Sequence, residues 1–315
     1  MGEETSESHG RILHKKAPEA NTVDIRSVIA YILQSSPVHW KTAVHRPKKS
    51  LGQNFLQDAN VAQKIVRLFD PKPADTVVEI GPGKGALTAL LLSHVPHMTV
   101  VELDDALAAG LAEQYPGQLT VLHSDILDVD LSALAPAGGA LRLIGNIPYN
   151  ITTPILFHVI GHRRAVRDFS VMMQTEVAQR IAAKPRTKEY GILSVFLQYY
   201  CTARIQFQVS KNSFFPVPSV SSTVVHLDFT APFPQTAAND ALFRRVVRGT
   251  FGVRRKTLRN GLRTIGVPPA MFDRLSVDLE LRPEELTTAD FVRLAGELEP
   301  AASAVLNTVA EGGDE

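Results

Sequence analysis

Cysteine is nearly absent from this sequence, and apolar runs long enough to cross a membrane are absent altogether. The single cysteine, Cys201, cannot form an internal disulfide, which fits a reducing compartment. No Cys/His cluster has the spacing of a zinc site, and we predict no metal. No apolar run reaches the roughly 18 residues of a spanning helix, and the acidic N-terminus argues against a signal peptide. These absences predict a cytoplasmic protein with no membrane partner.

Net charge is equally small, because 33 Lys and Arg residues face 32 Asp and Glu residues and leave +1. The protein is therefore not a polycation, and any binding of nucleic acid must depend on where the charges lie rather than on their sum. The chain has 315 residues and is 44% hydrophobic, which is enough for one large domain or two with an ordinary core.

Short apolar runs alternate with helical stretches from Thr76 onward, which favours an α/β fold with a parallel sheet covered on both faces. We predict parallel strands over 76–80, 98–103, 119–123, 141–145 and 169–173. The β-branched and aromatic runs 192–209 and 222–229 fit final antiparallel strands, and helices are predicted over 241–249, 254–265, 268–275 and 283–297. The expected organisation is an N-terminal extension (1–45), an α/β domain (46–232), a small C-terminal helical domain (238–299) and a flexible tail (300–315).

A glycine-rich turn, Gly81-Pro82-Gly83-Lys84-Gly85, follows the first strand. Glycine allows positive φ and lets a ligand lie against bare backbone. Glu102 ends the next strand, where an acid can hold two ribose hydroxyls, and Asp125 follows the third, where an acid can accept from an adenine amine. The glycine spacing is neither that of a dinucleotide fingerprint nor that of a Walker loop. These features predict a Rossmann-like methyltransferase sheet with S-adenosyl-L-methionine (SAM) as cofactor.

The fourth strand ends in the turn Asn146-Ile147-Pro148-Tyr149. An aryl amine is a poor nucleophile because its lone pair is delocalised into the ring. The Asn146 side-chain oxygen and a backbone carbonyl, of Ile147 or Pro148, could accept its two N–H bonds and localise that pair. Tyr149 offers a stacking surface worth roughly 1–3 kcal/mol per base, and Phe214 is the candidate second ring. We therefore predict methylation of the exocyclic amine of an unstacked adenine, with Asn146, Pro148, Tyr149 and Phe214 as catalytic residues.

In this order, the motifs resemble those of the ribosomal RNA adenine N6,N6-dimethyltransferase family, from about Lys48 to about Arg263. The segment Lys48-Lys49-Ser50-Leu51-Gly52-Gln53-Asn54-Phe55-Leu56 is similar to the family's N-terminal signature, which covers SAM. The resemblance implies that SAM contacts Asn54, Leu56, Gly81, Glu102, Asp125 and Asn146. It also implies that Asn146 is the catalytic asparagine.

Two further segments are more similar to one branch of that family, namely the loop Pro216-Val217-Pro218-Ser219-Val220-Ser221-Ser222 and the arginine-rich stretch 251–262. That branch dimethylates two adjacent adenosines near the 3′ end of small-subunit (16S) rRNA during ribosome biogenesis. The resemblance implies a pre-ribosomal 30S particle as partner, and we expect a monomer. The extension before Lys48 is longer than in most bacterial members.

Basic residues gather in the C-terminal region, where the stretch from Arg244 to Arg263 has eight of them and no acidic residue. Such a segment favours salt-sensitive contact with phosphates. We predict RNA-binding roles for Arg244, Arg245, Arg248, Arg254, Arg255, Lys256 and Arg259. Smaller clusters are Lys41, Arg46, Lys48 and Lys49, and Lys184, Arg186 and Lys188.

Three alternatives stay open from the sequence. They are a large-subunit (23S) rRNA methyltransferase of the macrolide-resistance type, an adenine-N6 DNA methyltransferase, and a non-catalytic nucleic-acid-binding factor on the same fold. The intact Asn146 and Tyr149 argue against the last of these, because a protein that only binds would not need them.

Overall fold

The computed structural model describes residues 47–48 and 51–302. The predicted extension over 1–45 and most of the predicted tail over 300–315 lie outside the described residues, as do the basic residues Lys41, Arg46 and Lys49. Within the described ranges, no helix is both long and apolar enough to span a membrane.

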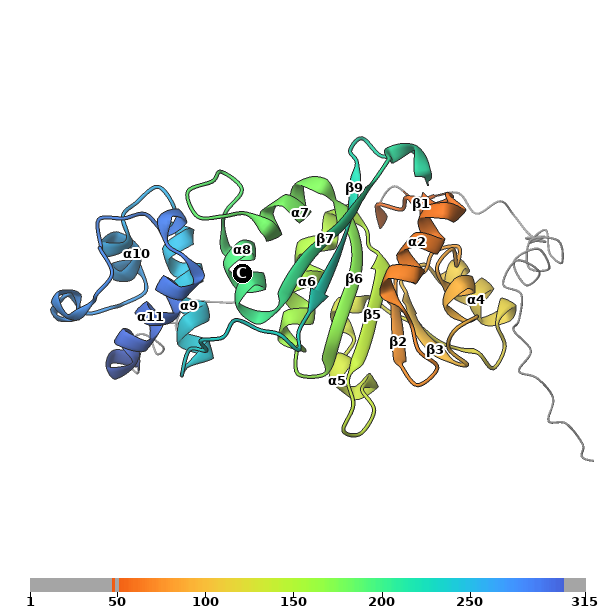
Figure 1. Cartoon of the computed structure of the whole chain (residues 1–315), viewed down its shortest axis with the longest axis horizontal. Coiled ribbons are helices and arrows are strands. Elements are labelled where there is room, and N and C mark those ends of the chain that lie inside the picture. Colours follow the sequence, from red (N-terminus) through yellow and green to blue (C-terminus); the bar gives the residue numbers. More distant parts are fainter. Residues whose placement is uncertain (1–46, 49–50, 303–315) are drawn as a thin grey trace, which may run out of the picture. The chain divides into compact units, whose positions relative to one another are not determined.

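A seven-stranded sheet runs in the order β4-β3-β2-β5-β6-β9-β7, which confirms the predicted Rossmann-like α/β fold. Its parallel strands are β2 (Thr76–Ile80), β3 (Met98–Glu102), β4 (Leu119–His123), β5 (Leu141–Asn146) and β6 (Val166–Gln174). The antiparallel strands are β9 (Ser222–Asp228) and β7 (Thr202–Val209), which Figure 1 shows beside β6. The chain runs from β2 to β3 and β4 and then places β5 on the other side of β2. The point where the strand order switches therefore lies at the carboxyl end of β2, where such folds bind ligands.

Neighbouring residues of the inner strands pack on opposite faces of the sheet. Val77 and Ile144 belong to one hydrophobic cluster, whereas Val78 and Leu143 belong to the other. The first cluster includes residues of α2 (Ala59–Phe69), α3 (Thr88–Leu91) and α4 (Asp105–Gln114), and the second includes residues of α5 (Leu131–Leu134), α6 (Thr152–Gly161), α7 (Thr175–Ala182) and α8 (Ile192–Tyr200). Burial on both faces explains why these strands are largely apolar runs in the sequence, interrupted by Glu79 and Arg142.

The predicted strand over 192–209 is wrong in its first half. Residues Ile192–Tyr200 form helix α8, and only Thr202–Val209 is a strand. The backbone N–H of Gly191 donates to the hydroxyl of Ser194 (3.0 Å), which fixes the start of the helix. A helix buried on nearly every side is apolar all round, so its periodicity cannot be told from that of a buried strand.

The C-terminal helices are α9 (Asp240–Gly252), α10 (Leu258–Thr264) and α11 (Thr288–Leu298), with short 3₁₀ turns at Pro269–Arg274 and Pro283–Glu285. The predicted helix over 254–265 therefore begins later than expected. Leu258 and Arg259 donate their backbone N–H groups to the carbonyls of Leu281 (2.7 Å) and Leu279 (3.0 Å). This long-range pairing satisfies the first N–H groups of α10, and the basic residues before Leu258 lie in a turn.

Asp240, the first residue of α9, joins three helices. Its carboxylate accepts from the Tyr200 hydroxyl of α8 (2.6 Å) and pairs with Arg244 of α9 (3.0 Å) and with Arg163, just after α6 (3.4 Å). The hydrophobic cluster that covers α6 and α8 also continues through α9, α10 and α11. The C-terminal helices thus share a core with one side of the sheet.

Candidate active site

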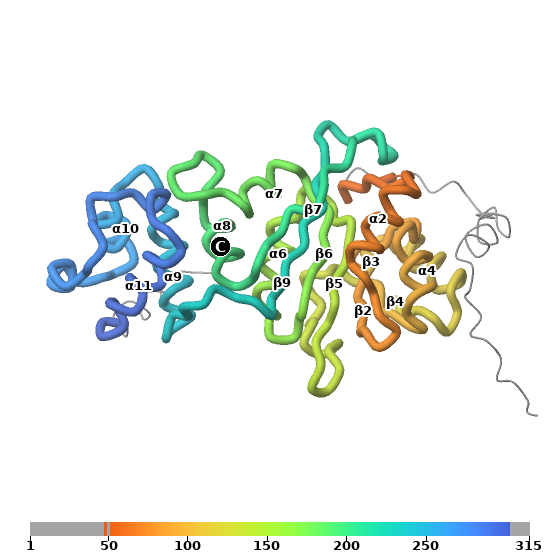
Figure 2. The backbone as a smooth tube through the Cα atoms, in the orientation of Figure 1, coloured from red at the N-terminus to blue at the C-terminus, as the bar shows by residue number. Residues whose placement is uncertain are grey.

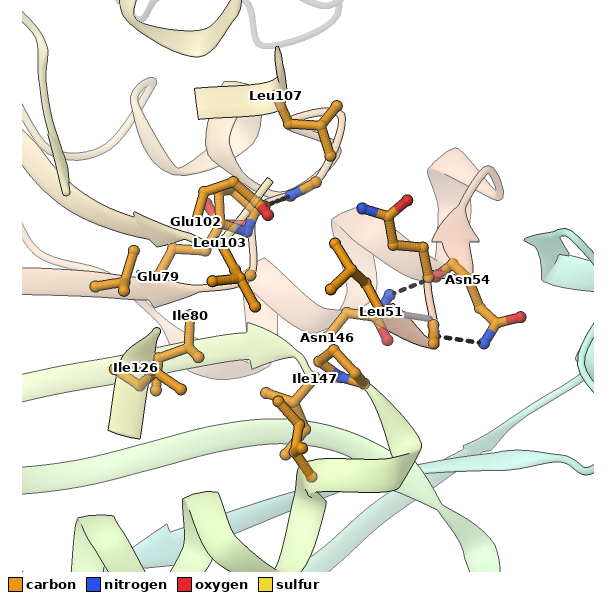
Figure 3. A pocket seen from close by; sticks show the side chains of 18 of the residues that line it. Leu51, Asn54, Glu79, Ile80, Glu102, Leu103, Leu107, Ile126, Asn146 and Ile147 are labelled. Atoms are coloured by element: carbon orange, nitrogen blue, oxygen red, sulfur yellow. Dashed lines mark hydrogen bonds between the residues drawn. The ribbon is translucent and has the colours of Figure 1, made fainter. Parts of the chain in front are cut away.

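A cavity of about 260 Å³ opens at the carboxyl ends of the parallel strands. Figure 3 shows its labelled side chains around a common space, with Glu102 on one side and Asn146 on the other. Its walls are largely apolar and include Ile80, Leu103 and Ile126. Ligands of α/β sheets bind at this edge, so the cavity is the candidate site.

The predicted catalytic and SAM-binding residues meet in this cavity with one exception. Asn54, Leu56, Gly81, Glu102, Asp125, Asn146, Pro148 and Tyr149 all line it. Phe214 does not, because its ring is 2% exposed and packs in the cluster that contains Leu56 and Met172. To stack on a base, Phe214 would have to leave that cluster. The exposed ring of the pair is Phe215, at 51%.

The glycine turn adopts the left-handed backbone that its residue types predict. Gly81 and Gly83 have φ values of 65° and 57°. A Cβ at Gly83 would lie 3.0 Å from the ring of Phe55, so the close approach of β1 (Phe55–Leu56) also requires glycine there. The Gly83 N–H donates to a carboxylate oxygen of Glu102 (3.0 Å), which ties the turn to the end of β3.

Glu102 is a buried acid at the end of β3. Its two oxygens accept from the N–H groups of Gly83 (3.0 Å) and Asp104 (2.9 Å). Burial raises the pKa of Glu102, although these two N–H donors act in the opposite direction. A carboxylate oxygen can accept more than one hydrogen bond, so Glu102 retains capacity for ligand hydroxyls. Asp125 is similar, since one of its oxygens accepts from the N–H of Leu127 (2.9 Å).

Asp104 is a residue of this site that the sequence motifs do not reveal, although an Asp directly before a helix is a capping signal. It is 1% exposed and caps α4 by accepting from the N–H groups of Ala106 and Leu107. It also pairs with Lys48 (3.0 Å) and accepts from the Gln53 amide (3.1 Å). Asp104 therefore holds the N-terminal signature segment against the cavity.

Glu79, inside β2, is a second residue of this site that the sequence motifs do not reveal. It lines the cavity, is 1% exposed, and accepts from the Thr88 hydroxyl (2.6 Å). Burial raises its pKa to about 8, with a smaller contribution from nearby Glu102. The side chain is therefore a neutral acid at neutral pH, which avoids a buried charge below the ligand position.

We expect Glu79→Gln to remove a pH dependence of stability. A carboxyl whose folded pKa is raised from 4.5 to about 8 stabilises the fold most below pH 4.5, and this contribution is lost as pH rises through 8. Relative to Glu79→Gln, the wild type should lose on the order of a few kcal/mol of unfolding free energy across this range. Urea unfolding at several pH values measures the difference. Glu113→Gln, at an exposed position of α4, is the control, and parallel curves for wild type and Glu79→Gln would contradict the expectation.

The turn after β5 orients the Asn146 amide. Its Nδ2 donates to the backbone carbonyl of Asn54 (3.0 Å), which leaves Oδ1 as an acceptor at the cavity. The Pro148 carbonyl already accepts from the Thr152 hydroxyl (3.1 Å) and the Ile151 N–H (3.4 Å). The Ile147 carbonyl is therefore the better candidate for the second acceptor.

Tyr149 is fixed through its hydroxyl, which shares a hydrogen bond with the hydroxyl of Ser222 (2.7 Å). Ser222 is fully buried at the start of β9, and burial raises the pKa of Tyr149 although the Ser222 contact lowers it. The bond joins residues 73 positions apart in the chain. Ser222 thus sets the direction of the Tyr149 ring.

We expect Ser222→Ala to lower kcat by about fivefold, the effect of losing one ordinary hydrogen bond, while SAM affinity stays unchanged. Tyr149→Phe removes the same bond from the other side. The double variant should therefore be no worse than the single ones, as steady-state kinetics can measure. Fully additive losses would show that Ser222 does not act through Tyr149.

The predicted RNA-binding residues divide into two groups. In the first, Arg244 pairs with Asp240 (3.0 Å), Arg254 with Glu284 (3.5 Å) and Arg259 with Glu280 (3.0 Å), while Arg245 donates to the Ile265 carbonyl (3.2 Å). The second group is exposed and consists of Arg248, Arg255 and Lys256, which make no salt bridge within residues 51–302. The second group can contact phosphates without breaking a salt bridge seen among these residues.

Charge and shape also decide which cofactor the cavity suits. Two carboxylates line it, Glu102 and Asp125, beside the neutral acid Glu79, and Lys84 is the sole Lys or Arg among its lining residues. Lys84 lies 5.0 Å from the centre of the Phe55 ring. An acidic cavity with apolar walls disfavours phosphates and suits a nucleoside that carries positive charge, as SAM does.

Comparison with known proteins is consistent with this geometry. The family model for ribosomal RNA adenine dimethylases matches residues 44–299. A ribosomal RNA small subunit methyltransferase A from Acinetobacter baylyi is 44% identical over 272 residues, which cover 86% of this chain and 99% of that protein. A protein of the same name from Xanthomonas euvesicatoria pv. vesicatoria is 48% identical over 250 residues, 79% of this chain and 95% of the relative.

Solved structures show the same fold. A dimethyladenosine transferase from Plasmodium falciparum superposes with a TM-score of 0.65 at 24% identity, over 79% of this chain and 98% of that one. The 23S rRNA methyltransferase ErmE has a TM-score of 0.58 at 25% identity, over 78% of this chain and 100% of that one.

Proposed function

Because the chain belongs to the ribosomal RNA adenine dimethylase family, we propose that it dimethylates N6 of two adjacent adenosines near the 3′ end of small-subunit (16S) rRNA. Family membership makes it a SAM-dependent enzyme that dimethylates adenine in rRNA. The choice of small-subunit RNA is supported by relatives of 44% and 48% identity that carry that name, against 25% for the large-subunit enzyme ErmE. We further propose that it acts on a pre-ribosomal 30S particle, as a cytoplasmic monomer.

The observation that carries the mechanism is the anchored amide of Asn146. Since Nδ2 is held by the Asn54 carbonyl, Oδ1 can accept one N6–H bond of adenine while the Ile147 carbonyl accepts the other. Both contacts draw N6 toward tetrahedral geometry and localise its lone pair, with the base stacked on Tyr149. Bound SAM supplies an activated methyl group.

Each transfer replaces one N6 hydrogen by a methyl group and releases a proton. The first product still has one N–H to donate, so it can be held again for a second transfer. After two transfers no N–H remains, and the Asn146 and Ile147 oxygens lose their donors. The same two acceptors thus explain both activation and release of the dimethylated base.

We propose the remaining site assignments on their positions. SAM would be held by Asn54, Leu56, Gly81, Glu102, Asp125 and Asn146, which line the cavity. The domain over 46–232 would carry catalysis, and the helical domain over 238–299 would bind RNA phosphates first through Arg248, Arg255 and Lys256.

The decisive experiment offers labelled SAM to unmethylated small subunits, large subunits, the naked rRNAs and DNA, with nucleosides analysed by mass spectrometry. Dimethyladenosine that arises only in small-subunit RNA, at two adjacent positions, is the expected result. Label in large-subunit RNA or in DNA would overturn the proposal in favour of the corresponding alternative.

A further inference from the structure

Residues 215–221, which we call the rim loop, expose an unusual amount of apolar surface. Phe215 is 51% exposed, Val217 56% and Val220 41%. Within the described residues the other large exposed hydrophobics are Leu68, Leu103 and Ile205, so half of the set lies in this one short loop. Such a concentration marks an interaction surface.

Both ends of the rim loop are tied to elements of the cavity. At the first end, Phe215 pairs with Phe55 between β8 (Phe214–Phe215) and β1, and Phe55 lines the cavity. At the other end, Ser222 follows the loop directly and holds the hydroxyl of Tyr149. Figure 2 shows the segment between β7 and β9 projecting from one end of the sheet beside the N-terminal residues of the described part. Phe215 is therefore held next to the cavity.

The charge around the rim loop suits a polyanion. Between Glu189 and Asp228 the sequence contains no acidic residue. Lys211 is exposed just before β8, and Lys84 lies over the Phe55 ring at the cavity. One acid lies close by, since the Asp58 carboxylate accepts from the Ser213 hydroxyl (3.1 Å). An apolar surface whose own segment carries positive charge nevertheless favours nucleic acid over a cationic protein segment.

We propose that the rim loop receives the base of the nucleotide adjacent to the target adenosine, with the Phe215 ring as its stacking surface. The inference rests on the proposed function. A target base that enters the cavity leaves the stack of its neighbour, and the neighbour then lacks a partner on one face. An exposed aromatic ring fixed beside the cavity can replace that partner, and it does so for any base because every base has a π-face.

The test measures whether the Phe215 ring and the neighbouring base contribute to substrate binding through the same contact. Wild type and Phe215→Ala are assayed on small subunits assembled from unmethylated RNA, either intact or with an abasic nucleotide directly 5′ or directly 3′ of the adenosine pair. We expect Phe215→Ala to raise KM for intact subunits about tenfold. The abasic substitution on one side should raise the wild-type KM by a similar factor, and the two changes together should give no further loss.

Controls separate this result from unfolding and from failure of the proposed function. Ile205→Ala, on β7 and 50% exposed, should leave KM unchanged. Phe215→Trp should retain the wild-type KM, and SAM affinity should be unaltered in both Phe215 variants. Three results would overturn the inference. The increases in KM from Phe215→Ala and from the abasic nucleotide could multiply, or KM could stay unaltered in Phe215→Ala. The increase in KM could also be independent of the neighbouring base, because the loop contacts a protein of the particle. A wild type that methylates the adenosine pair normally while Phe215→Ala shows no defect refutes only this inference, whereas label elsewhere refutes the proposed function.

Discussion

Asn146→Ala should lower methyl transfer by about a hundredfold or more while SAM still binds within a few-fold of wild type. A single preorganised polar group aimed at the reacting atom contributes roughly 10²–10³ to kcat in other enzymes. Asn146 is such a group, because its Nδ2 bond to the Asn54 carbonyl (3.0 Å) fixes the side chain before adenine arrives. Removal of the side chain leaves one N6–H bond without an acceptor, and the lone pair returns to the ring.

Single-turnover methylation and calorimetric SAM binding measure the two parts of this prediction separately. Asn60→Ala, an exposed amide at the start of α2, is the matched control and should keep full activity. Asn146→Asp should also be impaired, because a carboxylate oxygen would face the Asn54 carbonyl in place of the amide donor. Turnover near the wild-type level in Asn146→Ala would exclude the residue from the role assigned to it. Loss of SAM binding to the same extent as activity would make it a cofactor ligand only.

The parts of the site that follow strand ends could be predicted from the sequence. Glu102, Asp125 and Asn146 each follow a recognisable apolar strand, and the carboxyl ends of parallel strands meet at one edge of the sheet. Their convergence on one cavity can therefore be predicted without knowing which distant residues are in contact.

The contacts between distant segments could not be predicted in this way. Whether Phe214 or Phe215 is buried depends on the pairing of β8 with β1, more than 150 residues earlier in the chain. The bond between Tyr149 and Ser222 has the same origin. Nothing in the local sequence indicates which of the two rings is exposed, and in the structure it is Phe215 rather than the predicted Phe214.

The basic C-terminal segment shows that charges counted along the sequence overestimate the positive charge that is unpaired in the fold. The stretch from Arg244 to Arg263 contains no acidic residue, yet Glu280 and Glu284 fold back onto it and pair with Arg259 and Arg254. Acids that neutralise a basic stretch need only be close in space. The segment therefore offers fewer unpaired cations than its composition suggests.

The environment of Arg142 is also one that the sequence does not predict. Arg142 lies within a strand that otherwise reads as apolar, and its guanidinium donates to Asp168 (2.9 Å), Asp75 (2.7 Å) and the carbonyls of Phe69 (2.6 Å) and Asp70 (3.0 Å). The side chains of Arg142 and Asp168 are both 7% exposed. This network joins β5, β6 and the end of α2 near the amino ends of the strands, away from the cavity.

Asp168→Ala should destabilise the fold by about 3–5 kcal/mol, because it leaves the buried Arg142 charge only partly compensated. Glu176→Ala removes an acid from an exposed pair with Arg180, in which Glu176 is 69% exposed, and should cost less than about 1 kcal/mol. Urea unfolding of both variants compares a buried with a surface ion pair in the same protein. Equal losses would show that the Arg142 network contributes no more than a surface pair.

The Arg142 network should also make the free energy of unfolding fall at acidic pH, and the lowered pKa of Asp75 gives the direction of this change. Burial raises the pKa of Asp75, but the hydrogen bonds from Arg142 and from the Lys72 N–H outweigh it, and the net pKa lies below the ordinary 3.8. A carboxylate with a lowered folded pKa stabilises the protein above its ordinary pKa, and this contribution is lost as pH falls through the folded value. Asp75→Asn should therefore be less stable than wild type near neutral pH, with the difference shrinking below pH 3.8. If the difference in unfolding free energy between wild type and Asp75→Asn stays constant from pH 7 to below pH 3.8, Asp75 acts through packing rather than through its charge.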